Sequence, residues 1–296
     1  MIESDLSNPP VTVYYLNSCL WEKDFLLNDI LGPICKNVIF FDKIEDISIA
    51  TQNHPQILIL TDTLPFQEVE TFVKKISPNA IFFTSGETGN HAQWLSLSAY
   101  TPLYCKQYNH FSIGTSPTNI VQIPLGYIKG FITKYDCPLS TIRPHVWAFV
   151  GELKSDRYEM CETFARFPNN VVVISKNTWN LERQHISPQQ LADIYRDAVF
   201  VPIGRGNCSL DCFRIYEAVA LGAIPVIVGR KDEIKQTFYY DGHIPPFVFC
   251  ENWDQAIDIC NVLLANPSQL IHRQASILQW WNERIMDIQC KIKKVI

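Results

Sequence analysis

The sequence predicts an α/β fold in which each of two domains holds an open parallel sheet covered by helices. The chain has 296 residues, and dividing by about 150 residues per domain gives two domains. Short apolar runs rich in β-branched and aromatic residues alternate with segments of helical periodicity in both halves. These runs are apolar throughout, which is typical of strands buried on both faces. We therefore expect two open α/β domains with parallel sheets that face each other across a cleft.

In the first half, four apolar runs are expected to be strands, at residues 11–16, 38–41, 57–60 and 80–84. Segments with helical spacing of apolar residues follow three of these runs, at 21–31, 66–76 and 92–97. This alternation predicts a parallel sheet, because parallel strands need long crossover connections that are usually helical.

Residues 124–144 are rich in Gly, Pro and polar residues, so we place the boundary there, between domains 1–135 and 145–296. The alternation then resumes. The expected strands are 146–150, 171–174, 198–203 and 224–228, and the expected helices are 157–166, 188–196 and 211–221. Apolar residues recur at helical spacing across 267–296, which predicts one or two amphipathic helices packed on the body of the protein.

The composition argues against several classes of protein. Hydrophobic residues make up 47% of the chain, which excludes a disordered chain. The 25 basic and 30 acidic residues do not favour the basic face of a nucleic-acid binder. Ten scattered cysteines are typical of reduced, mostly buried thiols in a cytosolic protein. Neither a signal peptide nor an apolar run of membrane-spanning length is recognisable, so we expect a soluble chain.

The segment 199–229 is the strongest candidate for a ligand site. An expected strand ends at Ile203, a loop with two glycines follows, and an expected helix begins near Asp211 and stops at Gly222. Ligands of open parallel sheets bind at the carboxyl ends of the strands, and a helix N-terminus offers free N–H groups to an anion. Arg205 adds a positive charge to this loop.

Two side chains of the following helix extend the same site. Arg214 and Glu217 are three residues apart, so they share a helix face that points back towards the loop. A guanidinium suits a diphosphate, because it can donate two parallel hydrogen bonds. A carboxylate one turn deeper suits a ribose diol. Together these residues predict a site for a nucleoside diphosphate.

Other interpretations of the segment stay open. It could be a degenerate dinucleotide-binding fingerprint, but Ser209 stands where the third glycine is needed. Cys208 and Arg214 have the C-x5-R spacing of cysteine phosphatases, although no glycine lies between them. Cys208 and Cys212 could begin a zinc site, although no second Cys/His pair stands nearby. The remaining alternative is an ordinary loop, with Arg214 and Glu217 paired on the helix surface.

The segment resembles the exostosin family of glycosyltransferases, whose C-terminal domain carries P-x-G after a strand and then S-x-R-x-x-E-A-x-x-x-G-x-x-P-V-x. The matching residues here are Pro202, Gly204, Ser209, Arg214, Glu217, Ala218, Gly222, Pro225 and Val226. One difference is that Ser209 lies five residues before Arg214, where many members place a serine two before. Residues 123–130 and 146–157 are similar to the ribitol xylosyltransferase-like branch, and weaker similarities lie at 86–87 and 104–108.

The resemblance implies a GT-B arrangement of two Rossmann-like domains. It places a nucleotide-sugar donor in the C-terminal domain and the acceptor in the N-terminal domain, with no essential metal or other cofactor. It implies an inverting glycosyltransferase that uses a UDP-sugar by default, while the acceptor could be a glycan, a polyol-phosphate or a protein. The family motif assigns donor binding to Gly204, Ser209, Arg214 and Glu217, beside Arg205.

A second loop can supply further cations for the donor. Gly151 ends an expected strand, and Lys154 and Arg157 flank the start of the next helix, where Ser155 is a suitable N-cap. Together with Arg205, these cations could neutralise the leaving diphosphate in place of a metal ion. The alternative for Lys154 and Arg157 is a solvated helix end.

An inverting transfer also needs a general base that removes the proton of the acceptor hydroxyl. Glu87 follows an expected strand and matches the acidic segment of the family, so we expect it to be this base. Asp62 is better explained as the N-cap of the next helix. His91 and His110 are better explained as ordinary hydrogen-bonded histidines.

Two further expectations concern compartment and class. Asn207 begins an N-x-[ST] sequon inside the expected donor loop, where a glycan would obstruct the site, so we expect a cytoplasmic protein. The Ser209 to Arg214 spacing and the open identity of the base leave a second function possible. The chain could be a catalytically inactive module that binds a sugar nucleotide or a glycan.

Overall fold

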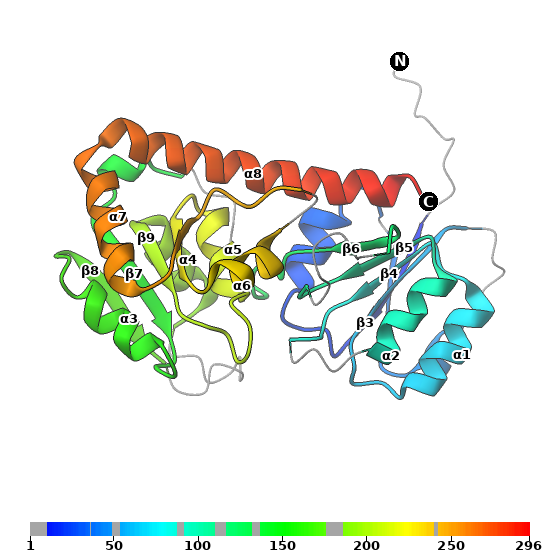
Figure 1. Ribbon diagram of the computed structural model, residues 1–296. Coiled ribbons are helices and arrows are strands. Elements are labelled where there is room, and N and C mark those ends of the chain that lie inside the picture. The colour runs from blue at the N-terminus through cyan, green and yellow to red at the C-terminus, as the bar shows by residue number, and fades with distance from the viewer. Residues whose placement is uncertain are drawn as a thin grey trace, which may run out of the picture. The chain divides into compact units, whose positions relative to one another are not determined.

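The computed structural model describes residues 11–35, 37–48, 54–87, 92–109, 117–131, 137–175, 186–239 and 242–296. These residues form two compact units, each built on its own parallel sheet (Figure 1). Unit 1 contains the described residues of Met1–Asn109, Gly114–Pro124 and Ile285–Ile296, and unit 2 lies within Leu125–Arg284. The α/β class with two parallel sheets is therefore confirmed. That the two domains face each other across a cleft stays a prediction.

The sheet of unit 1 has six parallel strands in the order β2-β1-β3-β4-β5-β6. Their bounds are β1 (Thr12–Leu16), β2 (Asn37–Phe41), β3 (Gln56–Leu60), β4 (Ala80–Phe83), β5 (Leu103–Lys106) and β6 (Ile120–Gln122). Because β1 lies between β2 and β3, the direction in which strands are added reverses there. The carboxyl ends of β1 and β3 consequently flank a topological switch point.

The helical segments of unit 1 follow the predicted periodicity with one difference. Helix α1 (Phe66–Ile76) buries Val69, Phe72, Val73 and Ile76, which recur at the spacing of one helix face. The segment expected as a helix at 21–31 instead contains a short π-helix, η1 (Phe25–Ile30). The remaining segments are η2 (Ile44–Asp46), α2 (Ala92–Leu95) and η3 (Ser96–Tyr100).

The sheet of unit 2 has five parallel strands in the order β11-β10-β9-β7-β8. Their bounds are β7 (His145–Gly151), β8 (Asn170–Ile174), β9 (Ala198–Ile203), β10 (Ile224–Val228) and β11 (Val248–Cys250). The chain adds β8 on one side of β7 and then β9, β10 and β11 on the other. The switch point of this sheet therefore lies between the carboxyl ends of β7 and β9, which is where such sheets bind ligands.

The described residues of the second half of the chain form six α-helices: α3 (Arg157–Phe164), α4 (Pro188–Arg196), α5 (Phe213–Ala220), α6 (Lys231–Phe238), α7 (Trp253–Ala265) and α8 (Pro267–Lys293). The tail predicted as one or two helices is the single helix α8 (Figure 1). It buries Leu270, Ile277 and Trp281, and the Trp281 ring stacks on Tyr216 of α5 at a centroid distance of 5.7 Å.

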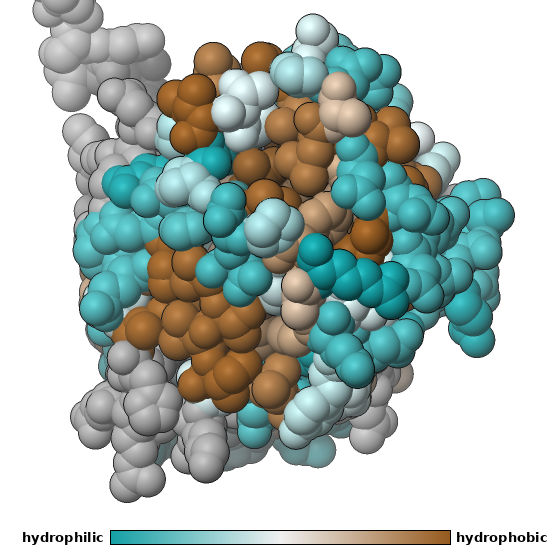
Figure 2. Space-filling view, turned by 90° about the vertical axis from the view of Figure 1, so that its left-hand side faces the viewer, coloured by the Kyte–Doolittle hydropathy of each residue, from teal (hydrophilic) through white to brown (hydrophobic). Residues whose placement is uncertain are grey.

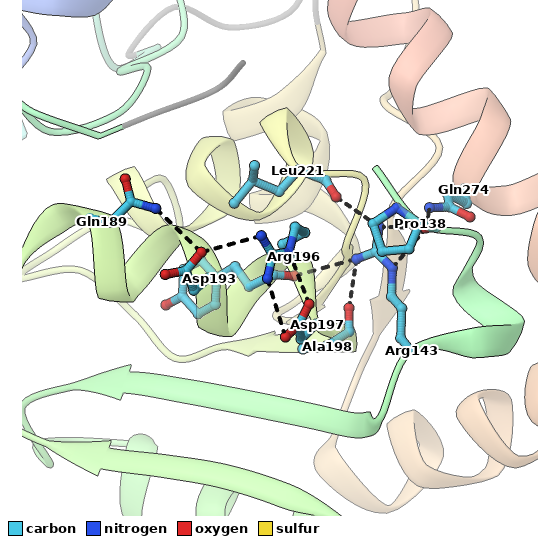
Figure 3. Close-up of polar contacts among 10 residues, drawn as sticks. Pro138, Arg143, Gln189, Asp193, Arg196, Asp197, Ala198, Leu221 and Gln274 are labelled. Atoms are coloured by element: carbon cyan, nitrogen blue, oxygen red, sulfur yellow. Dashed lines mark hydrogen bonds and ion pairs between the residues drawn. The ribbon is translucent and has the colours of Figure 1, made fainter. Parts of the chain in front are cut away.

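A buried arginine fixes the amino-terminal edge of the sheet in unit 2 (Figure 3). The guanidinium of Arg143 donates to the carbonyls of Ala198 and Leu221 at 2.7 Å each, and to that of Tyr195 at 3.3 Å. It also donates to the carbonyl of Pro138 at 3.1 and 3.2 Å. One side chain thus satisfies carbonyls at the ends of α4 and α5, where positive charge is favoured.

Edge strands contradict the prediction that all strands are buried on both faces. Ile39 and Phe40 of β2 are exposed in unit 1, and so are Val172 and Ile174 of β8 in unit 2. Each of these strands pairs with a neighbour on one side within the described residues. Figure 2 faces the side of the molecule on which Figure 1 shows β8, and apolar side chains gather on that face.

The division into units falls between Pro124 and Leu125, at the start of the predicted boundary segment 124–144 and before the predicted domain end at residue 135. Ile285–Ile296 joins unit 1. The Pro/Gly-rich segment used to place the boundary contains residues that pack in unit 2, such as Phe131 and Arg143. Among the described residues, no helix combines the length and the apolar character needed to cross a membrane.

Candidate functional site

The carboxyl ends of β7, β9 and β10 bring together most of the predicted donor-binding residues of unit 2. Gly151 ends β7, Gly204 follows β9 and Gly229 follows β10. A β-carbon at Gly204 would lie 2.3 Å from Cγ of Arg157, so only glycine lets the loop after β9 approach α3 this closely. Gly151 has a φ of 153°, and a β-carbon there would lie 3.5 Å from Nη1 of Arg214.

The buried side chain of Arg157 links the loops after β7 and β9 through hydrogen bonds. Its exposed fraction is 4%. Nη1 donates to the Glu152 carbonyl at 2.9 Å, and Nε and Nη2 both donate to the Arg205 carbonyl, the former at 3.0 Å. Burial and the nearby Arg214 lower the pKa of Arg157 to about 10. Arg157 therefore orders the two loops here, and its contact with a diphosphate stays a prediction.

Arg205 and Lys154, the two other predicted cations, both have partners in the loops. Arg205 forms a bidentate ion pair with Glu233 of α6, in which Nη2 donates to Oε2 at 2.8 Å. Its backbone N–H donates to Oδ1 of Asp156 at 3.1 Å. Nζ of Lys154 donates to Oδ1 of Asn207 at 2.6 Å, which joins the loop after β7 to the loop after β9.

Ser209 shapes the loop itself. Its Oγ accepts the backbone N–H of Asp211 at 3.0 Å, and its carbonyl accepts the N–H of Gly206 at 2.8 Å. Helix α5 begins at Phe213, slightly later than predicted, and Cys212 is the residue at its N-cap. Gly222 ends this helix with a φ of 67°, as the sequence predicts.

Arg214 points back to the loop, as its place on the helix predicts. Nη2 donates to the Gly204 carbonyl at 2.9 Å, and the guanidinium lies 5.8 Å from the centre of the Phe149 ring. Burial lowers the pKa of Arg214, but Cys212, Tyr195 and Glu217 outweigh that effect, so its pKa lies above its usual value. A charged guanidinium is therefore held at the switch point.

Glu217 is placed one turn deeper than Arg214 and is almost fully enclosed. Its exposed fraction is 2%, and its Oε1 accepts the backbone N–H of Ile128 at 3.5 Å. Burial raises the pKa of this carboxyl to about 7, although Arg214 and the Ile128 N–H lower it. The alternative of an Arg214–Glu217 pair on the helix surface is wrong, because Glu217 is buried.

The predicted base, Glu87, belongs to unit 1 and lies beyond the carboxyl end of β4, partly buried. Asp62 is not the N-cap of α1, since Pro65 occupies that position and Asp62 accepts the Thr61 hydroxyl at 3.1 Å. Ser155 is not the N-cap of α3 either. Asp156 precedes this helix, and Ser155 has a φ of 50°. His91 and His110 lie outside the described residues.

Two carboxylates that sequence reasoning missed lie near the strand ends. Glu22, which follows β1 in unit 1, is 4% exposed, and burial raises its pKa to about 7 while the Thr84 hydroxyl lowers it. The signal that could have revealed Glu22 in the sequence was a charged residue within a segment of periodic apolar residues. Glu233 gave no such signal, because it is separated from Arg205 by 28 residues.

Neither alternative use of the cysteines gains support from the geometry. Cys208 is exposed, whereas Cys212 is buried, and burial raises the pKa of the Cys212 thiol. Within the described residues, no three His, Cys, Asp or Glu side chains come together in a way that could hold a metal ion.

Comparisons with known proteins agree with the resemblance to the ribitol xylosyltransferase-like branch. Human ribitol-5-phosphate xylosyltransferase 1 is 24% identical over 179 residues, which cover 52% of this chain and 38% of that protein. The chain thus spans well under half the length of this relative.

A solved structure shares the fold at low identity. An α1,3-fucosyltransferase has a TM-score of 0.53 at 12% identity, covering 99% of this chain and 91% of its own. An O-GlcNAc transferase from Thermobaculum terrenum has a TM-score of 0.47 at 10% identity, covering 98% and 69%.

The family described as the RXYLT1 C-terminal domain matches residues 130–296, which is more than half of the chain. The matched region includes every residue named above at the carboxyl ends of β7, β9 and β10. The chain therefore belongs to the RXYLT1 C-terminal domain family.

Proposed function

We propose that this chain is a glycosyltransferase that moves a sugar from a nucleotide-sugar donor to an acceptor hydroxyl. The observation that carries the proposal is the family match across the whole switch point of unit 2, where three arginines and glycine-bounded loops meet. The name of the human relative favours a pentosyl group as the sugar and a polyol-phosphate as the acceptor class. A UDP-sugar is the default donor.

In this proposal the loops after β7 and β9 hold the diphosphate of the donor. Gly151 and Gly204 let backbone N–H groups approach the phosphates, while Lys154, Arg205 and Arg214 supply positive charge. Arg157 fixes the loops and adds to the local positive potential. Ser209 orders the turn before α5. Glu217 contacts the ribose after the backbone N–H of Ile128 has moved away from its carboxylate.

The same cations make a metal ion unnecessary in this proposal. When the bond between the sugar and the diphosphate breaks, negative charge grows on the leaving phosphate, and fixed guanidinium and ammonium groups can stabilise it. We therefore propose transfer that does not depend on divalent cations.

Glu87 is the proposed general base of an inverting transfer. The acceptor oxygen attacks the anomeric carbon, its proton passes to the Glu87 carboxylate, and the carbon–oxygen bond to the nucleoside diphosphate breaks. Each transfer consumes one nucleotide-sugar and releases one nucleoside diphosphate. A cytoplasmic location is proposed too, because a glycan at Asn207 would obstruct the donor loop.

Turnover tests this function and separates it from an inactive binding module. With UDP-xylose and ribitol 5-phosphate as first substrates, and then with wider panels, the wild-type protein should release UDP in an acceptor-dependent manner. Glu87→Gln should lower kcat by roughly 10²- to 10⁴-fold with an unchanged donor Kd, because only the proton transfer is lost.

Glu68→Gln, at an exposed position in the first turn of α1, is the matched control and should keep wild-type turnover. Wild-type kcat in Glu87→Gln would refute the base assignment. Donor binding without UDP release in the presence of any of the acceptors would instead favour the inactive module.

A further inference from the structure

The arginine of the loop after β9 already binds an anion, the carboxylate of Glu233. Nη2 of Arg205 donates to Oε2 at 2.8 Å and Nη1 donates to Oε1, so the pair is bidentate. Glu233 is the third residue of α6 (Lys231–Phe238), the helix that follows β10. A carboxylate that follows β10 therefore already accepts the hydrogen bonds of a guanidinium that follows the neighbouring strand β9.

The partners of this carboxylate are the partners that a phosphate group prefers. The Arg205 hydrogen bonds hold the pKa of Glu233 below its usual range against the effect of burial, and the backbone N–H of Arg230 lowers it further. A guanidinium fork and an N–H group at the start of a helix are both common ligands of phosphate.

The surrounding backbone is shaped for close approach at this point. A β-carbon at Gly229 would lie 3.5 Å from Oε2 of Glu233 and 2.7 Å from Cδ1 of Leu210. Gly204 directly precedes Arg205. The carboxylate thus lies among the glycine-bounded loops at the carboxyl edge of the sheet, where ligands of such sheets bind.

We propose that the Glu233 carboxylate is an internal substitute for the donor diphosphate: it binds Arg205 in the free protein, and the incoming diphosphate displaces it. The inference rests on the proposed function, which makes Arg205 a diphosphate ligand. Glu233 keeps the loop ordered before the donor arrives. After transfer, its return to Arg205 competes with the product diphosphate and speeds product release.

Glu233→Gln tests this inference without removing the helix cap. Glutamine at this position can still accept the Arg230 N–H, as glutamate or glutamine does in a capping box, but it carries no charge. Removing a negative charge this close to a bound diphosphate should tighten binding of UDP and of inorganic pyrophosphate roughly tenfold at low salt. The difference should shrink as salt is added.

Asp254→Asn is the matched control. Asp254 lies in the first turn of α7 and pairs with Arg166 at 2.6 Å. Arg166 follows the carboxyl end of α3, whereas Lys154 precedes the amino end of this helix. The affinity of the Asp254→Asn variant for both probes should equal that of the wild-type protein. Thermal unfolding of each variant shows whether the fold is kept.

The outcomes separate this inference from the proposed function. Equal or weaker binding of both probes to Glu233→Gln than to the wild-type protein would overturn the inference, and UDP binding to both proteins would leave the proposed function standing. Tighter pyrophosphate binding by the variant, with no nucleoside diphosphate bound by either protein, would refute the nucleotide-sugar donor and with it the role of Glu233 as a substitute for the donor diphosphate. Failure of both proteins to bind either probe would refute both.

Discussion

Two buried glutamates carry unusual acid–base properties at the residue scale. Glu22 in unit 1 and Glu217 in unit 2 each have a pKa raised to about 7 by burial. In the unfolded chain each carboxyl would ionise near its ordinary value of 4.5. Because the folded state holds these protons at higher pH than the unfolded state does, both groups link stability to pH.

The pH dependence of unfolding tests this property. The stability that Glu22 contributes is fully present below pH 4.5 and is lost as the pH rises through about 7. Glu22→Gln removes this loss, so the variant should be more stable than the wild-type protein at pH 8 by roughly 2 to 3 kcal/mol. At pH 4.5 the two should be nearly equal.

Urea unfolding at several pH values measures the difference, with Glu45→Gln as an exposed control on the same unit. A constant difference between Glu22→Gln and the wild-type protein across this pH range would contradict the raised pKa.

The sequence predicts single residues well where a local motif fixes them. Gly204 and Arg214 lie within a loop and helix whose order in the chain already places them together, and Gly222 ends α5 as predicted. Arg157 was predicted at the loop after β7, but not as a buried link to the loop after β9, because its carbonyl partners on Glu152 and Arg205 come from two strand ends. Glu233 needs the β9–β10 pairing before its distance from Arg205 can be known.

At the element scale, α4, α5 and the segment before β7 are tied together through Arg143. Its donors bind carbonyls of Pro138, Tyr195, Ala198 and Leu221, and burial lowers its pKa to about 10. Such a set of buried carbonyls loses its partners together if the guanidinium is removed, and each unsatisfied buried group is costly.

Arg143→Lys should destabilise the protein by about 2 to 4 kcal/mol, because a single ammonium cannot reach carbonyls spread around a planar guanidinium. Arg166→Lys is the control, since Arg166 is exposed and pairs across the surface with Asp254. That change should stay within about 0.5 kcal/mol. Urea unfolding measures both, and equal stabilities for the two variants would show that Arg143 does not hold these elements together.

Several elements with a clear apolar pattern were predicted, whereas the helices α6 and α7 and the shortest strands were not. The residue ranges of α1, α4 and β9 match the prediction. Strands β5, β6 and β11 were missed, because runs of three or four residues carry too little periodicity. The edge strands β2 and β8 read as fully buried, because apolar composition does not reveal which strand lies at the edge of a sheet.

At the scale of the whole molecule, both units add their strands to the sheet in a similar order. Unit 1 adds β2 on one side of β1 and then β3 to β6 on the other, and unit 2 repeats this with β8 and β9 to β11 around β7. Each unit therefore has its own switch point, which suits a function that needs two ligands. In our account the switch point of unit 2 binds the donor, and Glu87 of unit 1 serves the acceptor.

The most direct test of this account is calorimetric titration of the wild-type protein with nucleoside diphosphates and nucleotide-sugars, with and without EDTA. We predict binding of UDP and of one UDP-sugar that EDTA does not weaken, and loss of that binding in Arg214→Ala with the fold retained. If no nucleoside diphosphate binds the wild-type protein, then the loops at the carboxyl ends of β7, β9 and β10 have a structural role alone, and the central claim is wrong.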